Sequence, residues 1–156
     1  MIVGISSTTS HGQPRKTIVL VRHAEKEISD DADPHLSGEG LKRAERLVEK
    51  IKKYKPGAIY STNYIRTSET VAPMAKHRKL AAKIYDPKKQ GDLVAEVLSS
   101  KTKRFLIVGH SNTIPILANL LLKKDLFKSL DESEYGTIWI IRIKNGKTPS
   151  LELFEY

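Results

Sequence analysis

The sequence has no cysteine among its 156 residues. The chain therefore has no disulfide bond, no thiolate nucleophile and no thiolate metal site. It also has no HExxH-like spacing, so zinc would need another cluster of His, Asp and Glu side chains. We accordingly expect an activity that uses no cofactor and no metal ion.

Long hydrophobic runs are also lacking. No apolar run approaches the roughly 20 residues that span a bilayer. The apolar piece 2–5 is shorter than the roughly 7 to 15 residues of a secretory core. We expect residues 1–16 to form a flexible N-terminal arm and residues 17–156 to form a single globular domain. No membrane partner is expected and the default location is cytoplasmic, with export by a signal preceding this numbering as the alternative.

Acidic residues are few relative to basic ones. The chain has 27 Lys and Arg against 18 Asp and Glu, a net charge of +9. Such a charge suits nucleic acid, an anionic surface or an anionic small substrate. The lysines are scattered over predicted helices with few aromatics between them, which is typical of a solvated surface. We expect no nucleic-acid partner, and the positive field would steer a phosphorylated partner to the site. A non-catalytic anion- or nucleic-acid-binding module stays open as an alternative.

Short apolar runs alternate with amphipathic segments along the chain. This alternation predicts an α/β three-layer α/β/α sandwich with a mostly parallel central sheet and an antiparallel edge. Ser37, Asp92, and Thr113 or Asn112 are the expected helix N-caps, and Pro73 falls inside a predicted helix. The expected strands are 17–21, 58–60, 83–85 as a possible edge strand, 105–108, 137–143 and 151–156, with a hairpin through Asn145-Gly146.

Positive side chains follow three of these strands. Arg22 and His23 follow the first strand, Arg66 begins the helix after the second, and His110 follows the strand 105–108. The carboxyl ends of parallel strands meet at one edge of a sheet, where α/β proteins bind ligands. A charge pair at about 4 Å contributes roughly 4 kcal/mol at an effective dielectric constant near 20, before desolvation. The pattern predicts a phosphate or sulfate site in which these side chains replace the magnesium of many phosphoryl-transfer sites.

Four motifs in order resemble a known family. Val21-Arg22-His23-Ala24-Glu25 resembles an R-H-G-E signature with alanine in the glycine place, and Leu36-Ser37-Gly38-Glu39-Gly40 resembles L-T-x-x-G. The stretch 60–70 resembles S-x-L-x-R-A-x-x-T-A, and Val108-Gly109-His110-Ser111-Asn112 resembles a second histidine motif. On these motifs, over residues 17–122, the chain is identified as a member of the histidine phosphatase (phosphoglycerate mutase-like) superfamily.

The resemblance implies a covalent mechanism. His23 is the nucleophile that forms a phosphohistidine, and Arg22, Arg66 and His110 surround the phosphoryl oxygens. Water then releases inorganic phosphate.

The resemblance also implies supporting residues. Asn112 and Ser61 are expected to assist substrate binding rather than catalysis. The proton donor is expected after the Arg66 helix, where Asp86 and Asp92 are the candidates. We favour Asp86, because Asp92 is equally expected to cap a helix, and we expect Glu25 to orient its neighbours.

The segment from Arg66 to Phe105 is short, which indicates an open cleft. This is similar to the small bacterial phosphohistidine phosphatases, so the expected substrate is a phosphorylated small molecule or a phosphoprotein. A phosphoglycerate mutase or sugar-phosphate phosphatase on the same scaffold is the alternative. It would need a second phosphate pocket, to which Lys88 and Lys89 could contribute. The sequence leaves the oligomeric state open.

Overall fold

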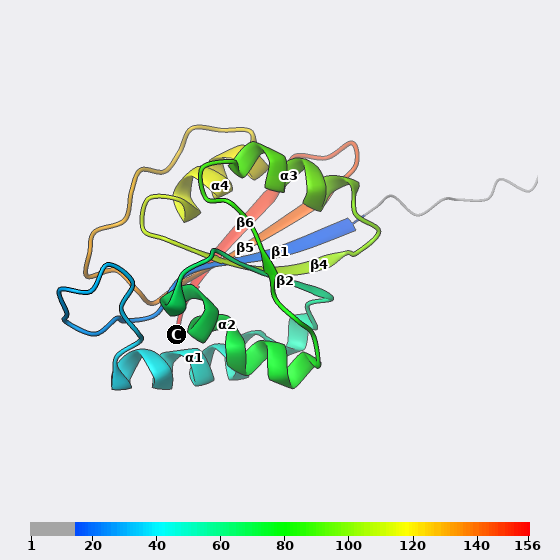
Figure 1. The fold of residues 1–156 in the computed structure, drawn as a ribbon. Coiled ribbons are helices and arrows are strands. Elements are labelled where there is room, and N and C mark those ends of the chain that lie inside the picture. The colour runs from blue at the N-terminus through cyan, green and yellow to red at the C-terminus, as the bar shows by residue number, and fades with distance from the viewer. Residues whose placement is uncertain (1–14) are drawn as a thin grey trace, which may run out of the picture.

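Six strands form one mixed sheet in the order β3-β2-β4-β1-β5-β6, flanked by helices on both faces (Figure 1). The structure is a computed structural model that describes residues 15–156. Strands β3, β2, β4 and β1 run parallel, while β5 is antiparallel to β1 and β6 is antiparallel to β5. The predicted fold class is therefore confirmed. The elements are β1 (Arg15–Arg22), α1 (Gly38–Ile51), the 3-10 turn η1 (Lys52–Tyr54), β2 (Ala58–Ser61), α2 (Ile65–Arg78), β3 (Lys83–Ile84), α3 (Gln90–Ser99), β4 (Arg104–Gly109), α4 (Ile114–Leu122), β5 (Thr137–Lys144) and β6 (Ser150–Glu155).

The two central strands, β1 and β4, are apolar on both sides because helices cover both faces of the sheet. Ile18 and Leu20 of β1 pack in the cluster that includes residues of α3 and α4. Val19 and Val21 point the opposite way, into the cluster with α1 and α2. Continuous apolar runs are typical of parallel strands buried on both faces, which is why the runs in these strands identified the core.

The register of β1 against β4 places the two histidine segments side by side. Arg22 pairs with Gly109, and the His23 amide donates a 2.8 Å hydrogen bond to the Gly109 carbonyl. His23 and His110 therefore leave adjacent strands at the same level. Tertiary pairing thus joins residues that are 87 positions apart in the chain (110 − 23).

Several element boundaries differ from the prediction. Strand β1 begins at Arg15 rather than residue 17, because Arg15 and Lys16 pair with β5. Helix α3 begins at Gln90, so Asp92 lies in its first turn and the prediction of Asp92 as its N-cap was wrong. The Asp92 amide already donates to the Lys89 carbonyl, which shows that the helix has started before it. The rest of the predicted arm, residues 1–14, lies outside the described residues.

Three local predictions are confirmed. The Ser37 side chain caps α1 by accepting a hydrogen bond from the Gly40 amide, and Thr113 is the N-cap residue of α4. Pro73 lies inside α2.

Among residues 15–156, no helix is long and apolar enough to cross a membrane.

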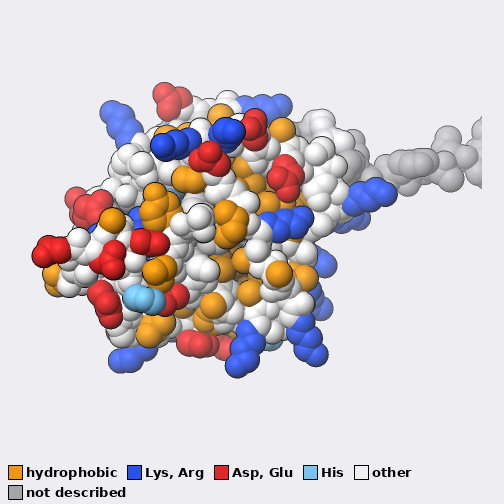
Figure 2. All heavy atoms as spheres, viewed as in Figure 1, with side chains coloured by type: hydrophobic (Ala, Val, Ile, Leu, Met, Phe, Trp, Pro, Cys, Tyr) orange, Lys and Arg blue, Asp and Glu red, His pale blue; other side chains and the backbone are white. Residues whose placement is uncertain are grey.

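On the face shown in Figure 2, basic side chains are dispersed and acidic side chains gather at one end. Glu27, Asp30 and Asp31, in the loop after β1, are exposed. The basic residues on this face therefore form a dispersed solvated surface rather than one continuous patch.

Candidate active site

The structure brings together the four side chains predicted from the strand ends. Arg22, His23, Arg66 and His110 all line a cavity of about 660 Å³. The rings of His23 and His110 lie 5.4 Å apart, with 65° between their planes. Two guanidinium groups and two imidazoles therefore face one space, where the two arginines offer charged hydrogen-bond donors to a tetrahedral anion.

His23 is held in a single tautomer. Its Nδ1 lies 2.8 Å from the Ala24 carbonyl oxygen, which can only accept, so Nδ1 carries the proton and Nε2 keeps a free lone pair. The Ala24 amide in turn donates to Thr70 Oγ1 at 3.0 Å, which fixes this stretch of backbone to α2. Burial, with Arg22, His110 and Arg66 nearby, lowers the pKa of His23 to about 3. The ring is therefore neutral at pH 7, with the lone pair of Nε2 available.

His110 is oriented by two buried threonines. The Thr67 hydroxyl has the carbonyls of Thr62 and Tyr64 as acceptors, at 3.0 and 2.9 Å. Thr67 Oγ1 then accepts from the Thr62 hydroxyl at 2.9 Å, and Thr62 Oγ1 accepts from His110 Nε2–H at 2.9 Å. Burial, followed by the charges of Arg66 and Arg22, lowers the pKa of His110 to about 4. His110 is neutral in this state, with its proton on Nε2.

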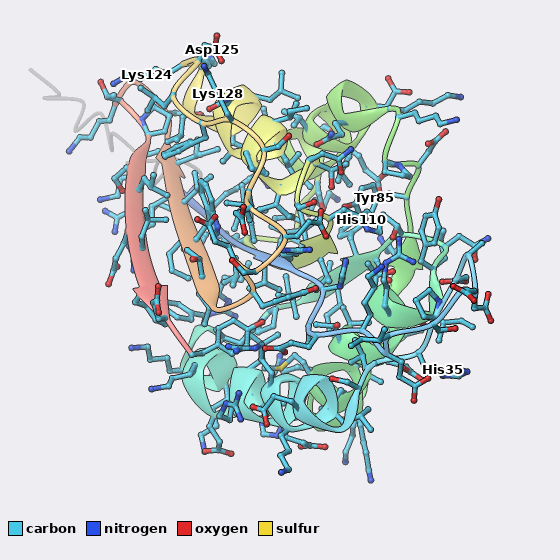
Figure 3. The ribbon with its side chains drawn as sticks, turned by 90° about the vertical axis from the view of Figure 1, so that its left-hand side faces the viewer. His35, Tyr85, His110, Lys124, Asp125 and Lys128 are labelled. Carbon is cyan, nitrogen blue, oxygen red and sulfur yellow. The ribbon has the colours of Figure 1, made fainter. Side chains whose placement is uncertain are left out.

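The floor of the site below His110 is also closely packed. Figure 3 labels His110 and Tyr85 next to each other. The Tyr85 hydroxyl donates to the Val108 carbonyl at 3.1 Å, inside β4. A Cβ atom at Gly109 would lie 2.8 Å from both the Tyr85 hydroxyl and Thr113 Oγ1, so only glycine fits between the two histidine segments.

Arg22 is buried and is bound by the loop between α4 and β5. Its Nη1 donates to the carbonyls of Asp131, Glu132 and Glu134, at 3.0, 3.1 and 2.9 Å. Its Nη2 lies 3.3 Å from a carboxylate oxygen of Glu132, and the Tyr135 ring lies 4.0 Å from its Cζ. The loop that contains Ser129, Leu130 and Glu132 therefore forms one wall of the site.

Arg66 lies in the first turn of α2, where the Asp33 carboxylate binds the start of the helix. Asp33 accepts hydrogen bonds from the Ile65 amide at 3.0 and 3.2 Å and contacts Arg66 Nη1 at 3.4 Å. The Tyr64 ring lies 4.5 Å from the Arg66 guanidinium and meets His110 edge-on at 5.0 Å. These contacts hold Arg66 at the mouth of the cavity.

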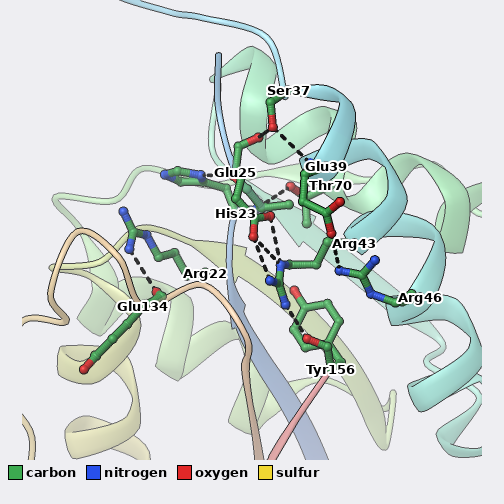
Figure 4. A network of polar contacts seen from close by, with 12 residues as sticks. Arg22, His23, Glu25, Ser37, Glu39, Arg43, Arg46, Thr70, Glu134 and Tyr156 are labelled. Carbon is green, nitrogen blue, oxygen red and sulfur yellow. Dashed lines mark hydrogen bonds and ion pairs between the residues drawn. The ribbon is translucent and has the colours of Figure 1, made fainter. Parts of the chain in front are cut away.

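A second polar network fixes the loop after His23 from behind (Figure 4). Arg43 of α1 donates from Nε and Nη2 to the Glu25 carboxylate at 2.7 to 2.9 Å, and from Nη1 to the Tyr156 carbonyl. Glu25 therefore ties the loop after β1 to α1 and to the end of β6. This contact agrees with the expectation that Glu25 orients its neighbours.

The other predicted site residues divide into two groups. Asn112 lines the cavity, as do Lys88 and Lys26. Ser61 is fully buried and donates to the Thr62 carbonyl at 3.0 Å, and it does not line the cavity. Asp86 is exposed, and its carboxylate accepts from the Lys88 amide at 2.8 Å in a turn. The structure therefore places Asp86 outside the cavity, because its side chain turns back onto its own loop.

Sequence reasoning missed four residues at the site: Thr62, Tyr64, Glu132 and Tyr135. Tyr64 directly precedes the predicted helix with Arg66, so the strand-end argument could have found it. Glu132 and Tyr135 belong to a polar loop with no periodicity, and only their contacts with Arg22 reveal them. Within residues 15–156, no group of three His, Cys, Asp or Glu side chains is arranged to hold a metal ion.

The buried histidines predict a loss of stability in acid. A neutral buried histidine binds its proton more weakly in the folded than in the unfolded chain, so its stabilisation is complete above pH 6.5 and falls as the pH drops toward its folded pKa. For His23, whose pKa is about 3, the loss between pH 7 and pH 5 is about 2 kcal/mol. In urea unfolding at both pH values, His23→Gln should lose about 2 kcal/mol less than the wild type. Equal losses in both proteins would contradict the buried neutral state of His23.

Arg22, His23, Arg66 and His110 form a cage suited to a tetrahedral anion at the edge of an α/β sheet, and the fold was compared with known proteins. The model of the histidine phosphatase superfamily (branch 1) matches residues 18–88, a range that includes Arg22, His23 and Arg66. A search of curated proteins found no match.

Solved structures share the fold over most of the chain. SixA from Nakamurella multipartitia, assigned as a phosphohistidine phosphatase, is 18% identical, with a TM-score of 0.70 over 92% of this chain and 98% of its own. The protein histidine phosphatase SixA complexed with tungstate is 11% identical, with a TM-score of 0.70 over 89% and 96%. A mycobacterial glucosyl-3-phosphoglycerate phosphatase with inorganic phosphate is 16% identical, with a TM-score of 0.68 over 90% and 96%. The solved structures share the fold of this chain, and its segment 18–88 is similar to the histidine phosphatase superfamily.

Proposed function

We propose that the protein hydrolyses phosphomonoesters or protein phosphohistidine through a covalent phosphohistidine on His23, without a metal ion. The observation that carries this proposal is the state of the His23 ring. Its Nδ1–H is held by the Ala24 carbonyl, and its Nε2 keeps a free lone pair among Arg22, Arg66 and His110. A neutral imidazole surrounded by cations can attack the phosphorus of a bound dianion.

The first chemical step transfers the phosphoryl group to the enzyme. His23 Nε2 forms a bond to phosphorus while the bond from phosphorus to the leaving group breaks. Arg22 and Arg66 stabilise the charge on the oxygens that do not leave, which is the role that Mg²⁺ has in many other phosphoryl-transfer enzymes. His110 assists through its other ring nitrogen, because a phosphoryl dianion next to the ring favours protonation of Nδ1.

The second step restores the enzyme. Water attacks the phosphorus of the phosphohistidine, the N–P bond breaks, and inorganic phosphate leaves with the His23 ring neutral again. The Nδ1–H bond to Ala24 persists through both steps and keeps Nε2 directed at phosphorus. This fixed geometry lowers the entropic cost of each attack.

The shape of the site supports a phosphoprotein or another large phosphorylated substrate. Only the short segment 79–89, which contains β3, joins α2 to α3, so no inserted element covers the cavity there. Lys26 and Lys88 are exposed at its lining. The structural neighbours include protein histidine phosphatase SixA, which supports the same substrate class for this chain.

The sugar-phosphate phosphatase or mutase alternative has one supporting observation. Lys88 lines the cavity and offers a cation for a second anionic group, whereas Lys89 does not line it. Turnover of a phosphohistidine protein and of a panel of small phosphomonoesters, measured side by side, distinguishes the alternatives.

The test of the proposed function is hydrolysis of p-nitrophenyl phosphate in excess EDTA, followed by trapping of the phosphoenzyme. We expect turnover to persist in EDTA and the trapped phosphate to be stable in base and labile in acid, as phosphohistidine is. Absence of turnover on every phosphorylated substrate, together with salt-sensitive DNA binding, would instead indicate a nucleic-acid-binding module.

A further inference from the structure

We propose that Glu132 is the catalytic acid of this site and that substrate phosphate releases it for this role by displacing it from Arg22. The inference rests on the proposed function. When a phosphoryl group is transferred from the ester of an alcohol or an unactivated phenol, the departing oxygen must receive a proton. A carboxylic acid placed next to that oxygen can supply it. Neither guanidinium can supply this proton, because arginine stays protonated in proteins.

The neighbouring carboxylates are committed to structural contacts. Asp33 accepts from the Ile65 amide at the start of α2 and contacts Arg66. Glu25 is engaged by Arg43 on the far side of the loop after β1, and Asp86 closes its own turn. Of the described residues that line the cavity, Glu132 alone carries a carboxyl group.

The backbone of Glu132 is anchored while its side chain is free to move. Its carbonyl accepts from Arg22 Nη1 at 3.1 Å, and the carbonyls of Asp131 and Glu134 bind the same nitrogen. Its side chain is 82% exposed and makes a single 3.3 Å contact with Arg22 Nη2. At 3.3 Å this contact is long for a charge-assisted hydrogen bond, and its carboxylate side is open to solvent, so a phosphoryl group can displace it. The displaced carboxyl group stays at the cavity because three neighbouring carbonyls remain bound to Arg22 Nη1.

Exchange of the Arg22 partner changes the protonation of Glu132. In the empty site the Glu132 carboxylate contacts the Arg22 guanidinium at 3.3 Å. Once a phosphoryl dianion takes the Nη2 donor, the carboxylate loses its cation and gains an anionic neighbour, so it takes up a proton from solvent. Substrate binding therefore converts Glu132 into an acid at the moment when the reaction needs one.

The proton then follows a balanced path. As His23 Nε2 bonds to phosphorus and the P–O bond breaks, the carboxylic acid of Glu132 transfers its proton to the departing oxygen and becomes a carboxylate. In the second step this carboxylate takes a proton from the attacking water. When inorganic phosphate leaves, the Glu132 side chain returns to Arg22 and releases this proton to solvent, which restores the starting state.

The experiment compares Glu132→Gln with Glu27→Gln across a series of aryl phosphates, from p-nitrophenyl to phenyl to p-methoxyphenyl phosphate. Glu27 is exposed and does not line the cavity, so its substitution makes the same change in charge near the site. In Glu132→Gln we expect kcat/KM to stay within about three-fold for p-nitrophenyl phosphate, which leaves without help. For the most basic phenol we expect a fall of about 10²-fold. Glu27→Gln should keep the wild-type dependence on the leaving group.

The displacement of Glu132 from Arg22 by phosphate is tested separately, by the inhibition constant of inorganic phosphate. Removing the internal competitor should lower the inhibition constant of inorganic phosphate by about two- to five-fold in Glu132→Gln. A fall in kcat/KM that is equal for all leaving groups, or no fall at all, would overturn the assignment of the acid. An unchanged or weaker phosphate affinity would overturn the exchange. The proposed function fails separately, if the wild type shows no His23-dependent turnover of p-nitrophenyl phosphate, a substrate that needs no acid.

Discussion

Replacing His23 by glutamine is expected to lower kcat for p-nitrophenyl phosphate by at least about 10³-fold. Glutamine keeps a polar side chain in the cage but has no imidazole lone pair to attack phosphorus. Arg22, Arg66 and His110 would still bind phosphate, so inhibition by inorganic phosphate should persist in the variant. The measurement is steady-state turnover together with phosphoenzyme trapping, which should yield no labelled protein.

The control for this variant is His77→Gln. His77 is exposed on α2 and does not line the cavity, so its substitution should leave turnover unchanged. Turnover by folded His23→Gln at more than about a tenth of the wild-type rate would mean that water attacks phosphorus directly. The cage would then act by electrostatic stabilisation alone.

Gly40→Ala is expected to cost about 3 kcal/mol or more of stability, because helix α1 touches the loop after His23 at this residue. A Cβ atom at Gly40 would lie 2.0 Å from the Glu25 carbonyl oxygen. That carbonyl also accepts from the Ser37 amide at 2.9 Å, so neither partner can move without breaking the cap of α1. The shift would also disturb the Glu25–Arg43 pair, so activity should fall together with stability.

Gly38→Ala is the matched control for Gly40→Ala. A Cβ atom at Gly38, two residues earlier in α1, would have nothing within 4 Å. This variant should be as stable as the wild type, or more stable by up to about 1 kcal/mol, since alanine reduces the entropy of the unfolded chain. Urea unfolding of both variants decides the matter, and equal free energies of unfolding would contradict the close approach at Gly40.

Two distant parts of the chain hold Arg22 in place. The loop from Asp131 to Tyr135 holds the guanidinium from one side, and the pairing of Arg22 with Gly109 fixes its main chain from the other. Because both supports come from distant parts of the chain, the binding geometry of Arg22 depends on complete folding of the domain.

The sequence by itself determined the sheet and the four residues of the cage. Runs such as Ile18–Val21 and Phe105–Val108 are apolar without a break, which predicts strands buried on both faces. Arginine and histidine side chains that follow such strands meet at one edge of a parallel sheet, so Arg22, His23, Arg66 and His110 followed from local patterns alone. The Ser37 cap was predictable for the same reason, because its partner is three residues away.

The tertiary structure alone decided the roles that depend on loops. Asp86 had the expected position in the chain, yet its carboxylate binds its own turn. Ser61 is the last residue of β2, one residue beyond the predicted strand, and it is fully buried. Glu132 reaches Arg22 across 110 residues, which no local period can encode. Strands and caps are set by neighbours in the chain, whereas a loop takes its conformation from the surface on which it folds. The proposal for Glu132 therefore rests on its contacts rather than on the sequence.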